Sequence, residues 1–200
     1  ADLIFNKLSD PSVYTWNAII SAHANLGQSE RAIDLYNSLV KSDTRANEYV
    51  YVAVLKACTN MLAVTHGNLL FSCIIEDGLE SDLFICNTSM DMYAKCGFLA
   101  KAKEVFDEIH TQDVVLWTSL IEGYLEHGYY EEVLDSFNRM QLEGVSLDTF
   151  TFMCGLKSCG NMATAKQGLQ IHARIQCKGF LEVDPIIGNV LVDMYAKCGQ

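Results

Sequence analysis

A seven-residue stretch, Asp91-Met92-Tyr93-Ala94-Lys95-Cys96-Gly97, returns unchanged as Asp193-Met194-Tyr195-Ala196-Lys197-Cys198-Gly199. The two copies lie 102 residues apart, and a shift of 101 residues aligns much of the sequence between them. Matching residues recur through this alignment: Trp16, Gly27, Leu55 and Cys58 fall on Trp117, Gly128, Leu156 and Cys159. Self-similarity over a fixed period is typical of a repeat protein.

Shorter units lie within the long period, and their lengths are about 35, 35 and 31 residues. One extra residue near Glu182 and Val183 changes the alignment offset from 101 to 102. We expect both ends of the chain to cut through repeats of a longer array. The predicted boundaries are the end of a preceding repeat at 1–12, complete repeats at 13–47, 48–82, 83–113, 114–148 and 149–184, and a partial repeat at 185–200.

Each unit has the pattern of two helices. Within residues 13–25 the apolar residues Trp16, Ile19 and Ile20 follow three- and four-residue steps, which indicate one buried helical face, and Gly27 then interrupts the pattern. The same pattern predicts helices at 1–8, 30–39, 49–60, 63–77, 84–95, 98–109, 114–126, 129–142, 150–161, 164–178 and 186–197. One pair cannot bury its own apolar face, so we predict an all-α fold, a right-handed superhelical solenoid of stacked antiparallel helix pairs.

Composition excludes several classes of protein. Half of the residues are hydrophobic, but no apolar run approaches the roughly 18 residues that span a bilayer, so we expect no membrane contact. Eight cysteines without a CxxC pair or a His/Cys cluster predict no metal site. The cysteines that recur in the alignment are expected to be small buried hydrophobic residues in a reducing compartment: Cys58, Cys96, Cys159 and Cys198.

The net charge of −11 argues against a nucleic-acid partner, because such proteins usually present a basic face. Most acids, however, lie in the predicted second helices or beside them: Glu30, Asp34, Glu76, Asp77, Glu104, Asp107, Glu108, Glu131, Glu132 and Asp135. The first helices carry a nearly balanced set, Lys56, Lys95, Lys157 and Lys197 against Asp91, Glu122, Glu126 and Asp193. We therefore expect the first-helix surface to be near neutral.

The units resemble pentatricopeptide repeats of the plant type that alternates P, L and S motifs. The resemblance rests on Trp16-Asn17-Ala18-Ile19-Ile20, Leu55-Lys56-Ala57-Cys58 and the two heptapeptides, and it extends over the whole chain. By this resemblance the P motifs are 13–47 and 114–148, the L motifs 48–82 and 149–184, and the S motifs 83–113 and the partial 185–200. Tetratricopeptide repeats have a similar period, but their Trp/Leu/Gly/Tyr pattern is absent.

The resemblance implies sequence-specific binding of single-stranded RNA in a mitochondrion or chloroplast, without a cofactor and with one base per repeat. The fifth and last residues of a repeat would read the base: Asn17 with Asn47, Val52 with Asp82, Asn87 with Asp113, Thr118 with Asp148, Met153 with Asp184, and Asn189 in the partial repeat. The second residue would sandwich bases: Tyr14, Tyr49, Phe84, Val115, Phe150 and Ile186. The thirteenth would contact phosphate at Lys95 and Lys197, whereas Glu126 departs from that pattern and Asn25, Asn60 and Asn161 stand elsewhere.

The chemistry of the last residue can be argued from the base edges. An ionised Asp only accepts hydrogen bonds, which suits uracil and guanine, whose ring nitrogen carries a proton. An Asn amide also donates, which suits the bare ring nitrogen of cytosine or adenine. The resemblance further implies that Asn at the fifth position accompanies pyrimidines and Thr accompanies purines. Together these rules predict an RNA core of the form 5′-C/U-N-U-G-N-pyrimidine.

Structural alternatives exist for several of these residues. Each last residue immediately precedes a first helix and would serve as an N-cap with or without RNA. The aromatic second residues could staple adjacent helices, and Trp16 and Trp117 are expected in the core. Asn17, Asn87 and Asn189 have less structural reason to lie one turn into a helix, where Asn is a mediocre helix former.

Two functions remain open from the sequence. Arrays with alternating P, L and S motifs usually belong to C-to-U RNA-editing factors, which implies target recognition here, other editing factors as partners, and any deaminase-like activity in a C-terminal domain outside this chain. The acidic balance instead favours a protein-interaction scaffold within an organellar RNA-processing complex. No nucleophile elbow, P-loop or zinc-deaminase signature is present, so we predict no enzymatic activity for these residues.

Overall fold

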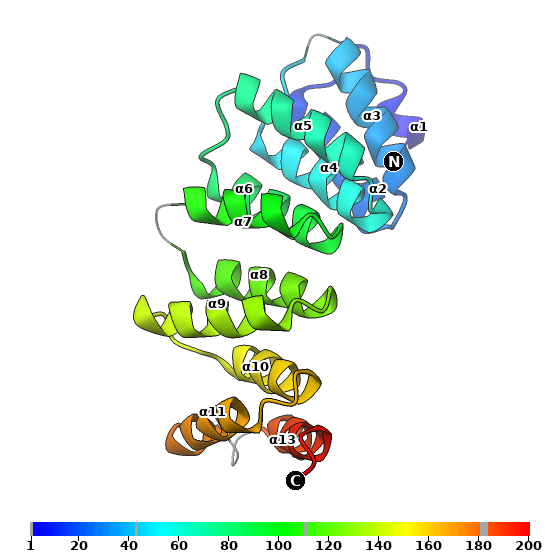
Figure 1. Cartoon of the computed structure of the whole chain (residues 1–200). Coiled ribbons are helices and arrows are strands. Elements are labelled where there is room, and N and C mark those ends of the chain that lie inside the picture. The colour runs from blue at the N-terminus through cyan, green and yellow to red at the C-terminus, as the bar shows by residue number, and fades with distance from the viewer. Residues whose placement is uncertain (1, 43, 110–111, 181–183) are drawn as a thin grey trace. The chain divides into compact units, whose positions relative to one another are not determined.

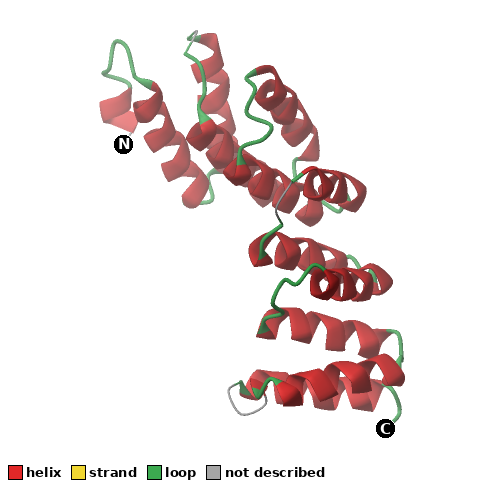
Figure 2. Ribbon diagram, turned by 90° about the vertical axis from the view of Figure 1, so that its left-hand side faces the viewer, coloured by secondary structure: helices red, strands yellow, loops and turns green. Residues whose placement is uncertain are grey.

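The computed structural model describes residues 2–42, 44–109, 112–180 and 184–200, and in this part of the chain it consists of helices and loops (Figure 2). The inserted residue near Glu182 and Val183 lies outside the described residues. The helices are α1 (Asp2–Phe5), α2 (Val13–Asn25), α3 (Ser29–Lys41), α4 (Glu48–Met61), α5 (Val64–Glu76), α6 (Leu83–Lys95), α7 (Leu99–Glu108), α8 (Val114–Glu126), α9 (Tyr130–Leu142), α10 (Thr149–Asn161), α11 (Ala165–Cys177) and α13 (Pro185–Lys197).

The predicted helices are confirmed apart from small differences at their ends, with one larger exception. Helix α1 covers only Asp2–Phe5, whereas residues 1–8 were predicted. The amide N–H of Leu8 donates to the carbonyl of Phe5 at 3.0 Å, so the chain leaves the helix through a tighter three-residue turn.

The chain divides into two compact units, Ala1–His110 and Thr111–Gln200. In the first unit α4 packs between α2 and α6, and α3, α5 and α7 pair with them as second helices. In the second unit α10 packs between α8 and α13, with α9 and α11 as its second helices. Figure 1 shows these helices lying side by side in chain order within each unit. The predicted fold class, an all-α solenoid of antiparallel helix pairs, is confirmed.

Each of the first helices α2, α4, α6, α8, α10 and α13 begins with a side-chain N-cap, which is Ser12 for α2. Asn47 caps α4, Asp82 caps α6, Asp113 caps α8, Asp148 caps α10 and Asp184 caps α13, each through its side-chain oxygen. Each such cap stabilises by about 1 kcal/mol. The second helices α3, α5, α7, α9 and α11 have no side-chain cap. The N-cap interpretation of the five last residues is therefore confirmed.

Most first helices end at a glycine in the left-handed region, such as Gly27 with φ of 74°. The 48–82 and 149–184 repeats place Leu62 (φ 51°) and Ala163 (φ 53°) at this turn instead. A side chain in this conformation costs about 1 kcal/mol or more. The sequence shows this difference directly, because Leu62 and Ala163 occupy the repeat position of Gly27 and Gly128.

The repeated heptapeptide has a structural role in both units. Met92 packs so closely on Gly67 of α5 that a Cβ there would lie 2.5 Å from the methionine methyl group, and Met194 meets Gly168 of α11 in the same way. The Tyr93 hydroxyl donates to Asn68 Oδ1 of α5 at 3.0 Å. These contacts attach each first helix to the second helix of the preceding repeat, so the heptapeptide marks a junction between neighbouring repeats.

The two tryptophans lie in the core, as predicted. Trp16 is 6% exposed and Trp117 is 1% exposed. The ring of Phe5 meets Trp16 edge-on, with ring centroids 4.6 Å apart. The Arg139 guanidinium lies 5.2 Å from the centre of the Trp117 ring, which adds a cation–π contact.

The prediction for the recurring cysteines is correct in part. Cys58 and Cys159 are buried, and burial raises the pKa of the Cys58 thiol to about 11. Cys96 and Cys198 are only half-buried, because they are the C-cap residues of α6 and α13 and lie at the edge of the packed layer. All eight cysteines are free thiols.

Candidate nucleic-acid interface

The second, fifth, ninth and thirteenth residues of each repeat share one face of its first helix, because they are three or four residues apart. We call these positions the stripe. The stripe residues are Tyr14, Asn17, Ser21 and Asn25 in α2; Tyr49, Val52, Lys56 and Asn60 in α4; Phe84, Asn87, Asp91 and Lys95 in α6; Val115, Thr118, Glu122 and Glu126 in α8; Phe150, Met153, Lys157 and Asn161 in α10; and Ile186, Asn189, Asp193 and Lys197 in α13. Every one of them is exposed or half-buried. The stripe is thus the solvent-accessible face of each first helix.

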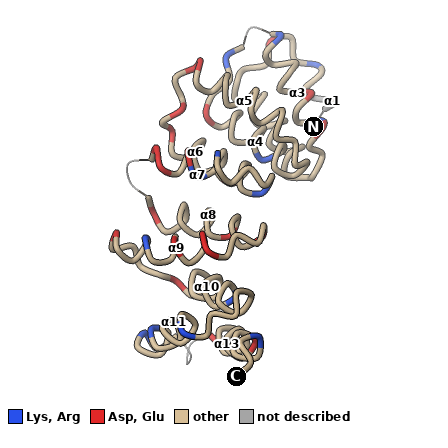
Figure 3. The backbone as a smooth tube through the Cα atoms, in the orientation of Figure 1, with Lys and Arg blue, Asp and Glu red and all other residues tan. Residues whose placement is uncertain are grey.

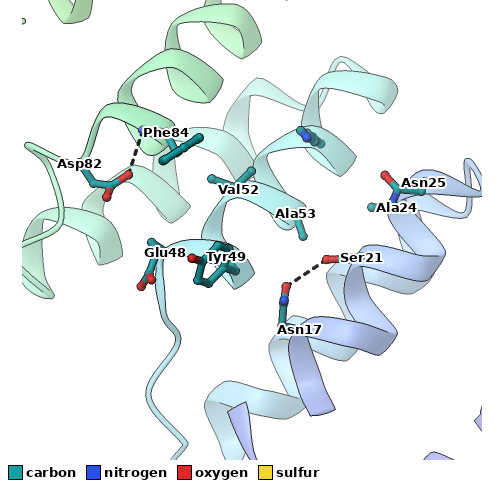
Figure 4. Close-up of a pocket in the computed structure, with 11 residues that line it drawn as sticks. Asn17, Ser21, Ala24, Asn25, Glu48, Tyr49, Val52, Ala53, Asp82 and Phe84 are labelled. Atoms are coloured by element: carbon teal, nitrogen blue, oxygen red, sulfur yellow. Dashed lines mark hydrogen bonds between the residues drawn. The ribbon is translucent and has the colours of Figure 1, made fainter. Parts of the chain in front are cut away.

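In the first unit the stripes of three neighbouring helices meet around one cavity of about 280 Å³. Its lining includes Asn17 of α2, Tyr49 and Val52 of α4, and Asp82 and Phe84 at the start of α6 (Figure 4). These five residues come from three repeats, and all five were predicted to contact RNA. The cavity therefore brings together an amide, a carboxylate and two aromatic rings.

The predicted base-sandwiching side chains face solvent. Tyr14 is 73% exposed, Tyr49 58%, Phe84 72%, Val115 60% and Ile186 57%, whereas Phe150 is half-buried. In the described part of the chain none of the four aromatic residues pairs with another aromatic ring. An exposed ring without an aromatic neighbour does little to staple two helices, so these positions are better suited to stacking on a flat ligand.

The fifth residues differ in how their polar atoms are used. Asn17 Oδ1 accepts a hydrogen bond from Ser21 Oγ at 3.0 Å, and Thr118 Oγ1 donates to the Val115 carbonyl at 2.9 Å. Asn87 Oδ1 is shielded from solvent yet has no hydrogen-bond partner among the described residues. An unsatisfied buried polar atom costs about 1–3 kcal/mol, which makes Asn87 a candidate for ligand contact.

The other fifth residues are Val52 and Met153, which are half-buried and apolar, and Asn189, which is exposed. Val52 and Met153 have no group that could hydrogen-bond a base edge. In those two repeats any polar contact must come from another position of the stripe or from the last residue.

The capping side chains use only one of their two polar atoms. Asp82 Oδ1 accepts from the amides of Phe84 and Ile85 at 2.9 and 3.1 Å, and the caps formed by Asp113, Asp148 and Asp184 also use Oδ1. No partner for any Oδ2 is present in the described part of the chain. Asn47 likewise caps through Oδ1 at 3.1 Å. An aspartate thus keeps a free acceptor and Asn47 a free amide donor, so capping and ligand contact do not exclude one another.

The lysines of the stripe fall into two groups. Lys95 and Lys197, the predicted phosphate contacts, form ion pairs with Asp91 at 2.9 Å and with Asp193 at 2.7 Å. Lys56 and Lys157 have no ion-pair partner among the described residues, and Lys56 lines the 280 Å³ cavity. Lys56 and Lys157 were not among the predicted site residues, although their spacing of four residues from Val52 and Met153 placed them on the same face.

The acidic residues predicted for the second-helix layer are exposed and lie in α3, α5, α7 and α9 or at their ends, as expected. Figure 3 also shows Asp and Glu on the chain just before α6, α8 and α10, where the capping aspartates lie. In the described residues no group of three His, Cys, Asp or Glu side chains could hold a metal ion. None of the described helices is both long enough and apolar enough to cross a membrane.

Comparison with family models matches most of the chain to one family. The model described as the PPR repeat family matches residues 11–60 and 112–161, and the model described as a PPR repeat matches residues 84–114. The matched segments cover the first helices α2, α4, α6, α8 and α10.

Similar curated proteins come from Arabidopsis thaliana and are named pentatricopeptide repeat-containing proteins. One is 36% identical over 198 residues, which are 98% of this chain and 27% of that protein. Another, named chloroplastic, is 34% identical over 98% of this chain and 37% of its own length, and a mitochondrial one is 33% identical over 100% of this chain and 31% of its own length. The chain thus spans about a third of the length of these relatives.

Among solved structures, the pentatricopeptide repeat protein PPR10 in complex with an 18-nt psaJ RNA element has the same fold. It superposes with a TM-score of 0.82 at 21% identity, over 94% of this chain and 28% of that protein. Nuclear proteinaceous RNase P 2 from Arabidopsis thaliana superposes with a TM-score of 0.66 at 13% identity, over 81% of this chain and 37% of that protein. With its helix pairs, its accessible stripe and family models that match more than half of its residues, this chain belongs to the pentatricopeptide repeat family.

Proposed function

We propose that this chain binds single-stranded RNA along the stripe, with one nucleotide for each repeat. The observation that carries the proposal is the cavity of the first unit, where Asn17, Tyr49, Val52, Asp82 and Phe84 line one space. All of these residue types are suited to a nucleobase, which offers a flat face for stacking and a polar edge for hydrogen bonds. PPR10, which has the same fold, was crystallised with RNA.

In the proposed complex a base enters between the exposed rings of Tyr49 and Phe84, which flank Val52 (Figure 4). Stacking on such rings contributes about 1–3 kcal/mol per base. The free Oδ2 of Asp82 then lies at the polar edge of the base, while Oδ1 continues to cap α6. Because Val52 adds no hydrogen bond, this repeat is assigned no preferred base. Other repeats would use their own second, fifth and last residues in the same way.

The free polar atoms of the caps also support the base preferences. The repeat 114–148 combines Thr118 with Asp148, whose free Oδ2 can accept a hydrogen bond from a ring N–H, and we assign it guanine. The repeat 83–113 combines Asn87 with Asp113, and we assign it uracil. With Asn47 as a donor in the first repeat and Asn189 in the partial one, the proposed core is 5′-C/U-N-U-G-N-pyrimidine.

The proposal also covers the biological setting of RNA binding. We assign 13–47 and 114–148 as P motifs, 48–82 and 149–184 as L motifs, and 83–113 and 185–200 as S motifs. An array of this order would recognise the target of C-to-U editing in a mitochondrion or chloroplast, together with other editing factors. Relatives named chloroplastic and mitochondrial support the organellar location.

The test is binding of synthetic RNAs that differ only at the third and fourth bases of the core. Fluorescence anisotropy should give a lower Kd for the U-G sequence than for the A-C sequence. Equal affinity for the two sequences would remove the proposed code, and absence of binding to either would remove RNA recognition altogether.

A second candidate is a protein-interaction scaffold, which the exposed acidic residues of the second helices favour. The two functions respond differently to salt. Binding to RNA weakens steeply as salt rises, with a slope set by the number of phosphate contacts. A protein bound through the acidic second helices contacts no RNA phosphate, so replacing the stripe lysines would not change its salt slope.

A further inference from the structure

One lysine lines the cavity of the first unit, and it forms no ion pair with the described residues. Lys56 lines the cavity, its side chain is exposed, and it has no ion-pair partner among the described residues. The other stripe lysine of this unit, Lys95, is held by Asp91 at 2.9 Å. Lys56 is therefore the lysine in this cavity whose charge is available to a ligand.

The position of Lys56 separates it from the carboxylates of the same cavity. Glu48 is the first residue of α4, and Asp82 caps α6, so both lie toward the helix N-termini. Lys56 lies two turns farther along α4, and the cavity lining on the α2 side is neutral, formed by Ser21 and Asn25. Figure 4 shows Glu48 and Asp82 on one side of the cavity and Ser21 and Asn25 on the other.

A nucleotide has a matching division of charge. Its base edge carries N–H groups that suit a carboxylate, and its phosphodiester carries a full negative charge that suits an ammonium group, which donates three hydrogen bonds and accepts none. Val52 cannot hydrogen-bond, and Lys56 is the stripe residue of this repeat that brings a positive charge into the cavity lining.

The second unit provides an internal comparison. At an offset of 101 residues, Lys157 replaces Lys56, but Glu122 stands in place of Ser21 and Glu126 in place of Asn25. Helix α8 packs beside α10 as α2 packs beside α4, so these two acids stand on the stripe of the helix next to Lys157. The same position is therefore cationic in the first unit and opposed by acids in the second.

We propose that Lys56 binds the backbone phosphate of the nucleotide held by repeat 48–82, and that Glu122 and Glu126 weaken the equivalent contact at Lys157. This inference rests on the proposed RNA binding and adds a contact at the ninth position of the repeat. Affinity for RNA is then concentrated in the first unit.

The first experiment compares Lys56→Met with Lys41→Met in the whole 200-residue chain. Methionine keeps the length and helix preference of lysine, and Lys41 is an exposed lysine at the end of α3, in the second-helix layer. Kd for the proposed core RNA is measured across a series of salt concentrations, with circular dichroism to confirm that both variants fold.

The slope of log K against log salt is negative, and loss of one phosphate contact to a single strand should make it shallower by about 0.7. This change corresponds to about a fivefold loss of affinity at 0.1 M salt. We expect this change for Lys56→Met at every base sequence, and no change for Lys41→Met. If both variants bind like the unaltered chain, the phosphate contact is wrong while RNA binding stands. A loss confined to one base, with an unchanged salt slope, would make Lys56 a base contact and would also overturn the proposal.

The second experiment gives the second unit the residues of the first. The double variant Glu122→Ser and Glu126→Asn should bind RNA several times more tightly and with a steeper salt slope, because Lys157 is then unopposed. Unchanged affinity would contradict the role assigned to the two acids. If the unaltered chain binds no RNA, the proposed function itself fails, which the first measurement of the series reveals.

Discussion

Asp148 offers a way to separate capping from the proposed base reading. Its Oδ1 accepts from the Thr151 amide at 2.8 Å and from the Thr151 hydroxyl at 2.6 Å, while Oδ2 is left for a ligand. Asp148→Asn retains the capping oxygen and converts the other oxygen into an amide donor. Asp148→Ala removes both the capping oxygen and the free oxygen.

The expected effects on stability follow from these contacts. Asn caps a helix about as well as Asp, so Asp148→Asn should cost less than about 1 kcal/mol, mainly from the lost charge at the helix N-terminus. Asp148→Ala loses the cap, worth about 1 kcal/mol, and leaves the buried Thr151 hydroxyl without its acceptor, which costs at least about 1 kcal/mol more. Urea unfolding should therefore show the alanine variant as clearly the less stable of the two.

Asp148→Asn should change RNA binding strongly, although it changes stability little. In Asp148→Asn a donor faces the ring N–H of guanine, which costs about 1–3 kcal/mol, or about five- to 150-fold in Kd. Adenine at the fourth base of the core should gain, because its bare ring nitrogen accepts from the amide. Anisotropy with RNAs carrying G or A at this base measures both effects. If Asp148→Asn retains the preference for guanine, Asp148 is a cap only, and the reasoning about its free oxygen is refuted.

Three further predictions concern the scaffold. Leu62→Gly should raise the free energy of unfolding by up to about 1 kcal/mol, because Leu62 is 63% exposed and holds a left-handed φ of 51°, which urea titration would detect. Gly67→Val should lower the free energy of unfolding by about 1–3 kcal/mol, because a Cβ would meet a methionine methyl at 2.5 Å. Gly188→Ala is its control and should raise the free energy of unfolding slightly, because a Cβ there meets open space. Iodoacetamide at about pH 8 should modify Cys177 but not Cys58 in the folded chain, since burial raises the pKa of the Cys58 thiol to about 11 and keeps it protonated. Mass spectrometry would locate the label, and rapid modification of Cys58 would show that this part of the core opens.

The helices were predictable because their signals are local. The three- and four-residue spacing of apolar residues, the capping residue and the terminal glycine act within one or two turns, so the printed sequence contains all of them. The helix predicted at 1–8 is an exception: it has no local stop signal before Pro11, yet the described helix ends at Phe5.

The sequence predicted which residues of the candidate site share a helix face, but not how their polar atoms are used. The residues of one stripe follow from helix geometry, and the fifth and last residues followed from the family resemblance. The ion pair between Lys95 and Asp91 could have been anticipated from their spacing of four residues. The division of Asp82 into a capping oxygen and a free oxygen could not, because it depends on a side-chain rotamer.

The sequence by itself determined the repeat, because its residues recur at a fixed offset. It also determined the helices, the caps and the accessible face of each first helix, because each of these depends on residues within a few turns of one another. Only the tertiary structure decided which faces meet. Asn17, Lys56 and Phe84 belong to three different helices, and they line one cavity because α4 packs between α2 and α6. The periodicity of a helix sets the direction of its own side chains, whereas the distance to a side chain on another helix depends on how closely the two helices pack.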